Sequence, residues 1–192
     1  MGPVAFFSLC LLGCLIFNPS LEASPRRERA LQPGSGRKAA ACSRGWFHYR
    51  DHCYKFFSEK LTWSDAEIEC QHEQTGAHLA SILNDAETNI VAQYLSTATS
   101  TDRVWIGLHD PNKDKTWLWT DGSRFRYRTW MAGEPNNDRS REYCVEMYAS
   151  TGYKKWNDVT CEREAPYLCK YQPKPEEPLA PAQEGTQHPG CK

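Results

Sequence analysis

Apolar and polar residues follow a helical rhythm in the first half of the chain and a strand-like rhythm in the second half. In the segment LTWSDAEIEC, Trp63, Ala66 and Cys70 recur at three- and four-residue spacing, which places them on one face of a helix. Thr62 precedes this run, and Asp65 lies three residues after Thr62, which is the spacing of a reciprocal N-terminal cap. The pattern predicts a helix that begins just after Thr62.

A second helix is predicted directly after the segment LASIL. Asn84 is suited to the N-cap, and Glu87 stands in the first turn, where an acidic side chain favours the helix N-terminus. Four apolar residues at helical spacing form the buried stripe that we expect on this helix: Ala86, Ile90, Tyr94 and Ala98.

Beyond residue 103, short segments rich in β-branched and aromatic residues alternate with polar turns, which is typical of strands. Two early helices followed by a run of antiparallel strands predict a domain of the α+β class. The predicted strands are VWIGL, WLWTDGS, FRYRTW, CVEMYA and YLCKY.

The two ends of the chain differ from its centre in composition. Residues 1–23 contain an apolar run, Phe6–Phe17, which suits a signal peptide and is shorter than the roughly 20 residues that span a bilayer. Residues 24–41 are basic and rich in small side chains and predict a flexible arm. Residues 172–192 contain five prolines and predict a disordered tail. We therefore expect a secreted protein with one folded domain, residues 42–171.

Charge and cysteine content narrow the class of protein further. Without the leader, 23 basic residues face 23 acidic ones, a balance that gives no reason to expect a nucleic acid partner. Seven cysteines remain, and in an oxidising compartment six of them would form three disulfides, for which 15 connectivities exist. One cysteine is left over. The seven are Cys42, Cys53, Cys70, Cys144, Cys161, Cys169 and Cys191.

Oxygen-bearing side chains concentrate in two stretches, GEPNNDRSREYC (133–144) and KKWNDVTC (154–161). Carboxylate and amide oxygens are the ligands that calcium takes in proteins, usually six to eight of them. The bland alternative is a hydrophilic turn, a common use of Pro and Asn. The candidate ligands are Glu134, Asn136, Glu142, Asn157 and Asp158.

The region 42–171 resembles a C-type lectin-like domain. The resemblance rests on GWFHYRDHCYKFF, LTWSDAEIEC, GAHLASIL, VWIGL and KKWNDVTCEREAPYLCKY, and it looks most like small secreted members such as the regenerating protein (lithostathine) group and its avian and reptilian relatives. It implies two helices packed on antiparallel sheets, a long calcium-binding loop, and the disulfides Cys42–Cys53, Cys70–Cys169 and Cys144–Cys161. Cys191 has no family partner and could link two chains as a homodimer or stay capped.

The resemblance also implies a role for the candidate ligands. In sugar-binding members of the family, a matching set of five side chains holds one Ca²⁺, and two sugar hydroxyls complete the coordination. Pro135 would follow a cis peptide bond that directs its neighbours toward the ion. The run Glu-Pro-Asn implies mannose-type glycans, those that carry mannose, fucose or N-acetylglucosamine.

An auxiliary calcium site occurs in some relatives and is only partly matched in this sequence. Asp110 and Asp114 could supply two of its carboxylates. Asn137 and Tyr143 stand where carboxylates are usual, so we expect the auxiliary site to be weak or missing.

Other motifs in the sequence bear on alternatives to a lectin. HEQTGAH lacks the histidine spacing of a zinc protease, and no nucleophile or acid–base set is evident, so we do not expect an enzyme. The alternating residues Arg124, Arg126 and Arg128 are either a solvated strand face or a contact for anionic glycans. The main alternative is a calcium-independent secreted factor that binds cell walls, mineral or a receptor.

Overall fold

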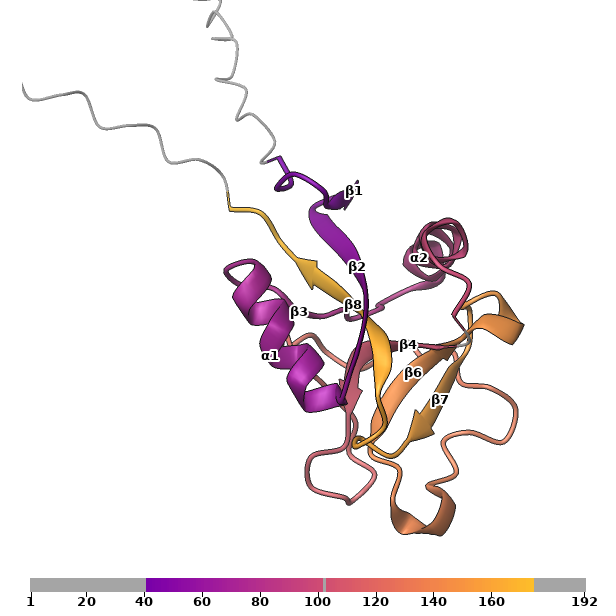
Figure 1. Ribbon diagram of the computed structural model, residues 1–192. Coiled ribbons are helices and arrows are strands. Elements are labelled where there is room, and N and C mark those ends of the chain that lie inside the picture. The colour runs from indigo at the N-terminus through magenta and orange to yellow at the C-terminus, as the bar shows by residue number, and fades with distance from the viewer. Residues whose placement is uncertain (1–40, 102, 175–192) are drawn as a thin grey trace, which may run out of the picture. The chain divides into compact units, whose positions relative to one another are not determined.

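Residues 41–101 and 103–174 are described by a computed structural model of the protein (Figure 1). The predicted leader and nearly all of the predicted arm, up to residue 40, lie outside these residues, as do Cys191 and the tail from residue 175 onward. Those features stay predictions. No helix in the described part of the chain is long and apolar enough to cross a membrane.

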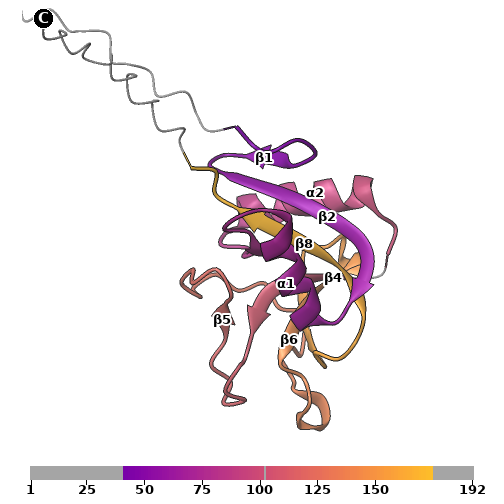
Figure 2. The same ribbon diagram turned by 60° about the vertical axis from the view of Figure 1, so that its left-hand side comes forward.

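Eight strands form one mixed sheet, which runs in the order β1-β2-β8-β4-β6-β7, with β3 paired to β8 and β5 paired to β4. The two helices lie on opposite sides of the β2–β8 pair (Figures 1 and 2). The strands are β1 (Phe47–Tyr49), β2 (His52–Leu61), β3 (His78–Leu79), β4 (Arg103–His109), β5 (Leu118–Trp119), β6 (Cys144–Tyr148), β7 (Trp156–Val159) and β8 (Ala165–Tyr171).

The strand pairing brings the two ends of the domain together. The last strand, β8, lies between β2 and β4, and its contact with β4 is parallel, at Trp105 and Tyr167. All other pairs between the named strands are antiparallel, as the sequence predicts. Trp105 and Tyr167 are both fully buried, so this central contact forms part of the core.

Both predicted helices form, and both begin where the capping residues indicate. Helix α1 spans Trp63–Glu73, and the Thr62 hydroxyl accepts the N–H of Asp65 at 3.3 Å. Helix α2 spans Asp85–Ala98, and the Asn84 side chain accepts the N–H of Glu87 at 2.9 Å. The buried face of α1 includes the residues predicted for it.

The buried face of α2 differs from the prediction. Ala86 and Ala98 are exposed, and Ile90 and Tyr94 are only half-buried. The core takes the neighbouring face instead, because Glu87 on that face finds buried partners in Tyr54 and Lys170. That face consists of Glu87, Thr88, Val91, Ala92 and Leu95.

A buried polar network explains why α2 turns this face inward. The Glu87 carboxylate accepts a hydrogen bond from Lys170 Nζ at 2.6 Å and from the N–H of Leu83 at 2.7 Å. The Tyr54 hydroxyl donates to the same carboxylate. Lys170 also donates to the Ser81 carbonyl oxygen at 2.9 Å. A paired charge can be buried at moderate cost, whereas an unpaired one cannot.

The strand predictions are confirmed in part. Four of the predicted segments overlap β4, β5, β6 and β8, but in FRYRTW only Trp130 makes a β-bridge, to Trp156. The sequence interpretation placed no strand before the first helix and so missed β1 and β2, and it also missed the short strands β3 and β7. In β2 the successive residues Cys53 and Tyr54 are both buried, so the strand lacks the two-residue alternation that marks a half-exposed strand.

Three disulfides fix the domain, and their pairing is the one that the family resemblance implies: Cys42–Cys53, Cys70–Cys169 and Cys144–Cys161. The second joins α1 to β8 across a separation of 99 residues. In the chain-entropy account, a disulfide that closes a loop of about this length stabilises the fold by at most about 4.7 kcal/mol. The third joins the start of β6 to the residues just after β7.

Candidate functional site

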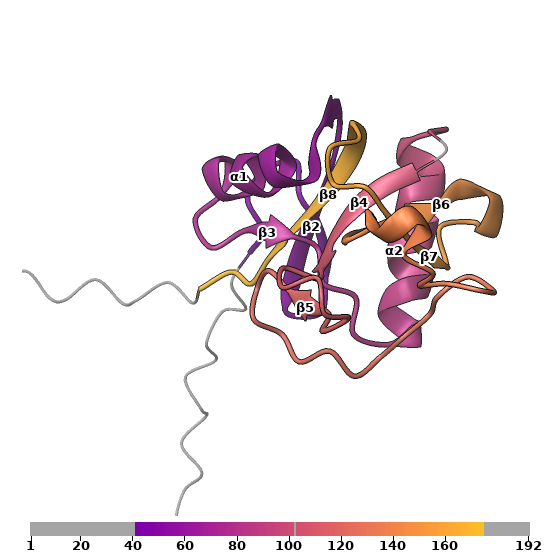
Figure 3. The same ribbon diagram turned by 90° about the horizontal axis from the view of Figure 1, so that it is seen from below.

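The two oxygen-rich stretches lie against each other because β7 is bonded to both ends of the loop 130–143. Trp156 donates its N–H to Thr129 O at 3.0 Å, and its carbonyl oxygen accepts the N–H of Met131 at 2.8 Å. Tyr143 donates its N–H to Val159 O at 3.1 Å. The loop itself projects at the bottom of Figure 1 and faces the viewer in Figure 3.

Asp158 is the centre of the candidate site. It is fully buried on β7, and its two carboxylate oxygens accept the backbone N–H groups of Asn136 at 3.1 Å and Asn137 at 2.8 Å. Glu134 Oε2 accepts the same Asn136 N–H at 3.0 Å. Two carboxylates therefore meet at one donor, and three of the five predicted ligands form a single hydrogen-bonded group. The peptide bond between Glu134 and Pro135 is cis.

The other two predicted ligands lie beside this group without joining it directly. Glu142 accepts the N–H of Asp138 at 2.7 Å and donates its own N–H to Asn137 Oδ1 at 3.0 Å. Asn157 precedes Asp158 on β7 and pairs across the ladder with Glu146 of β6. Asn157 and Glu142 are half-buried, so both remain within reach of solvent.

The electrostatics of the site disfavour full ionisation in the absence of a cation. Burial raises the pKa of Glu134 above its ordinary value, and the adjacent Asp158 raises it further. Burial also raises the pKa of Glu142, with a smaller contribution from the charge of Asp158, against the hydrogen bond from Asp138. The fully buried Glu146 has its pKa raised by burial to about 7, against the opposing charge of Arg103.

The donor set fits calcium in its chemistry. Glu134, Glu142 and Asp158 supply carboxylate oxygens and the two asparagines supply amide oxygens, which are calcium ligands. Within 41–101 and 103–174, no group of three or more His, Cys, Asp or Glu side chains is arranged to hold a metal ion. Backbone N–H groups of the loop occupy carboxylate oxygens of all three acids instead. A bound cation would replace such donors and offset the repulsion between the acids.

The residues considered for an auxiliary site are engaged in holding a neighbouring loop. Asp110 is almost fully buried, and its two carboxylate oxygens accept the N–H groups of Asp114 at 3.2 Å and Lys115 at 2.8 Å. Asp114 in turn accepts the N–H of Thr116 at 2.9 Å. The Tyr143 hydroxyl donates to Ser140 O.

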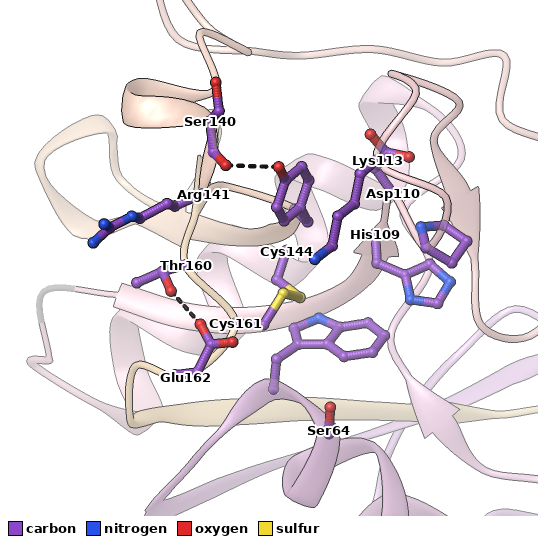
Figure 4. Close-up of a pocket in the computed structure, with 13 residues that line it drawn as sticks. Ser64, His109, Asp110, Lys113, Ser140, Arg141, Cys144, Thr160, Cys161 and Glu162 are labelled. Carbon is purple, nitrogen blue, oxygen red and sulfur yellow. Dashed lines mark hydrogen bonds between the residues drawn. A yellow bond between two sulfur atoms is a disulfide. The ribbon is translucent and has the colours of Figure 1, made fainter.

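A cavity of about 510 Å³ lies beside the Cys144–Cys161 disulfide and contains none of the five predicted ligands (Figure 4). Its lining carries charges of both signs. Lys113 Nζ lies over the Tyr143 ring at 5.0 Å. The hydrogen bond from Thr160 lowers the pKa of Glu162, and the charge of Lys113 lowers it further. The cavity is lined by residues of α1, the segment 109–113, the end of the loop 130–143 and the segment 160–162, and the sequence offered no signal for it.

The chain is similar in sequence to known C-type lectins. The family described as the lectin C-type domain matches residues 59–171. The chain is 42% identical over 171 residues to C-type lectin BfL-2 of Bungarus fasciatus, covering 88% of this chain and 98% of that protein. It is 43% identical over 133 residues to a C-type lectin mannose-binding isoform of Notechis scutatus scutatus, covering 69% of this chain and 84% of that protein.

Solved structures show the same fold. Human lithostathine aligns with a TM-score of 0.64 at 39% identity, over 68% of this chain and 99% of that one. A calcium-independent type II antifreeze protein aligns with a TM-score of 0.62 at 30% identity, over 70% of this chain and 97% of that one. Fold alone therefore does not decide whether calcium binds. Because the family model matches more than half of this chain, the chain belongs to the C-type lectin family.

Proposed function

We propose that this protein is a secreted lectin that binds mannose-type glycans through one Ca²⁺ held by the loop 134–142 and β7. The observation that carries the proposal is the meeting of the Glu134 and Asp158 carboxylates at the Asn136 N–H, with Glu142 in the same loop. Such an arrangement is costly without a cation, because like charges at short range repel. The relative from Notechis scutatus scutatus whose name includes mannose binding supports the choice of ligand.

The five side chains have complementary roles toward a sugar. Each of two neighbouring sugar hydroxyls donates a hydrogen bond to a carboxylate, from Glu134 or Glu142, and accepts one from an amide, Asn136 or Asn157. Asp158 holds the loop to β7 from its buried position. Calcium, when bound, would be held by these oxygen ligands, and the same two hydroxyls would complete its coordination. The run Glu-Pro-Asn at 134–136 matches the run that, by the family resemblance, implies mannose-type glycans.

Binding at one shallow site of this kind is weak, and several copies on one glycan surface would strengthen it. Cys191 lies outside the described residues and offers one route to a covalent dimer. A gel run without reductant tests that route, since a chain that migrates only as a monomer has no interchain bridge. Secretion is supported by the apolar run at Phe6–Phe17.

A second candidate function is calcium-independent binding of cell walls, mineral or a receptor. The solved structure that favours it is the calcium-independent antifreeze protein, which shares the fold at 30% identity. Backbone N–H groups of the loop donate to the carboxylates of Asp158 and Glu142, and such bonds can hold a loop of this kind together through the protein's own donors. Binding to calcite or peptidoglycan that ignores chelator would favour this function.

The test is retention of the full secreted chain on immobilised mannan in calcium and then in EDTA. We expect retention in calcium, release by EDTA, and loss of retention in Glu134→Gln. Glu164→Gln is the matched control, because Glu164 is an exposed glutamate outside the loop. Retention that survives EDTA, or a folded protein that ignores mannan in both buffers, contradicts the proposal.

A further inference from the structure

A second groove adjoins the candidate site. It has a volume of about 740 Å³, and its walls come from the segment 115–130 and from Pro135. Pro135 stands between Glu134 and Asn136, so the groove begins where the proposed sugar site ends. The groove and the mixed-charge cavity of Figure 4 share no lining residue.

One wall of the groove is aromatic and firmly supported. The rings of Trp117 and Trp130 lie 5.1 Å apart, and Trp130 packs edge-on against the fully buried Trp156 at 5.7 Å. Leu118 continues this wall and is 45% exposed, which is unusual for a leucine in this domain. Ligand pockets in proteins are commonly lined by aromatic side chains with a few polar groups that set orientation. The wall is a preformed apolar surface of this kind.

The rim of the groove is basic. Lys115, Arg124 and Arg128 line it, and no Asp or Glu does. Among the described residues, none of these three cations forms an ion pair within 4.0 Å, although Arg128 lies over the Phe125 ring at 5.2 Å. Arginine binds sulfate and carboxylate groups through paired, charge-assisted hydrogen bonds. The rim is therefore complementary to a ligand with several negative charges.

The local backbone explains why only some of the arginines reach the groove. Residues 124–129 are extended, and their burial alternates, so the arginines point outward while the residues between them, such as Phe125, are partly buried. Arg124 and Arg128 line the groove, whereas the equally exposed Arg126 does not. The side chain of Lys115 projects from a loop whose backbone is fixed by Asp110.

We propose that this groove is a second glycan subsite, which binds sulfated or carboxylated sugar units of an acidic oligosaccharide. Sugar rings lie on the Trp117 and Trp130 wall, and their anionic groups are bound by Lys115, Arg124 and Arg128. The proposal rests on the proposed function in taking a glycan as ligand, and it does not require calcium. A single acidic glycan of sufficient length would contact both the groove and the loop 134–142, because Pro135 borders both.

The probe is a heparin-derived hexasaccharide, titrated calorimetrically into the full chain in calcium and in EDTA. Exposed ion pairs are individually weak, so we expect Arg124→Gln with Arg128→Gln to weaken binding about fivefold to tenfold. Arg126→Gln is the matched control, with the same charge change in the same segment, and should weaken it less than twofold. Raising the salt concentration should weaken the wild type more than the double variant.

The outcomes separate this proposal from the proposed function. Mannan retention in calcium should be the same in the double variant and the wild type. A wild type that binds the hexasaccharide but not mannan would contradict the proposed function and not the second subsite. Equal losses from Arg126→Gln and the double variant would overturn the subsite, because diffuse charge would then account for binding. So would a wild type that does not bind the hexasaccharide, or one that binds a single-stranded oligonucleotide of equal charge as tightly through the same arginines. Thermal melting checks that each variant is folded.

Discussion

Replacing Glu134 with glutamine should have opposite effects on stability with and without calcium. Glu134 and Asp158 both accept the Asn136 N–H, so two carboxylates face each other. The pKa of Glu134 is raised in the folded state, chiefly by burial. A raised folded pKa means that the stability present below the unfolded pKa is lost as the pH rises through the folded one. At neutral pH the ionised Glu134 is therefore destabilising, and Glu134→Gln should stabilise the ion-free fold.

The size of each effect follows from the exposure of the residue and from mass action. Glu134 is half-buried, so relief of its repulsion is worth no more than about 1 kcal/mol. Calcium at about 100 times its dissociation constant stabilises the wild type by about 2.7 kcal/mol. Loss of one carboxylate ligand should weaken calcium by at least tenfold, which reduces that increment to about 1.4 kcal/mol or less at the same calcium concentration.

The assay is thermal unfolding of both proteins in EDTA and in calcium. For a domain of this size, 1 kcal/mol corresponds to roughly 3–5 °C in Tm, so calcium should raise the wild-type Tm by about 8–13 °C. We expect Glu134→Gln to melt at or slightly above the wild type in EDTA and to gain at most half of the calcium shift. Glu164→Gln should keep the full shift. A wild type whose Tm is the same in EDTA and calcium would refute the reasoning.

Three further predictions concern the core and the pH dependence. Lys170→Met leaves the Glu87 carboxylate buried without its cation, so the free energy of unfolding in urea should fall by about 3–5 kcal/mol. Stability restored by adding Glu87→Gln to Lys170→Met would show that the unpaired charge is the cause. Gly107→Ala would place a Cβ 2.4 Å from the Leu79 carbonyl oxygen, so its unfolding free energy should fall by at least 1–3 kcal/mol, and an unchanged value contradicts this packing. Mannan retention should fall as the pH drops toward about 4–5, where free glutamate titrates, because protonating Glu134 or Glu142 removes a calcium ligand; full retention at pH 4 would contradict the ligand assignment.

Local signals predicted the helices well and their orientation less well. Thr62 and Asn84 mark the helix starts because a cap is decided by residues three positions apart. The buried face of α2 is decided by distant partners, since Lys170 comes from the last strand and makes Glu87 an interior residue. Strand β2 was missed for a related reason, because its partner β8 lies about 100 residues further along the chain.

The candidate site was predictable in composition and not in detail. Carboxylates and amides at 134–142 and 157–158 indicate oxygen ligands from sequence alone, but the backbone donors that occupy Asp158 depend on how the loop folds over β7. The arginine alternation was visible as well. Which of these arginines line the groove depends on where the tryptophan wall lies, which no local pattern contains.

The most direct test of the central claim is a change of sugar preference by two loop residues. The wild type and the variant Glu134→Gln with Asn136→Asp are applied to mannose and galactose columns in calcium and then eluted with EDTA. We predict that the wild type is retained on mannose, that the variant moves toward galactose, and that EDTA releases both. A wild type held on mannose in EDTA, or a variant that keeps the wild-type preference, would contradict the account.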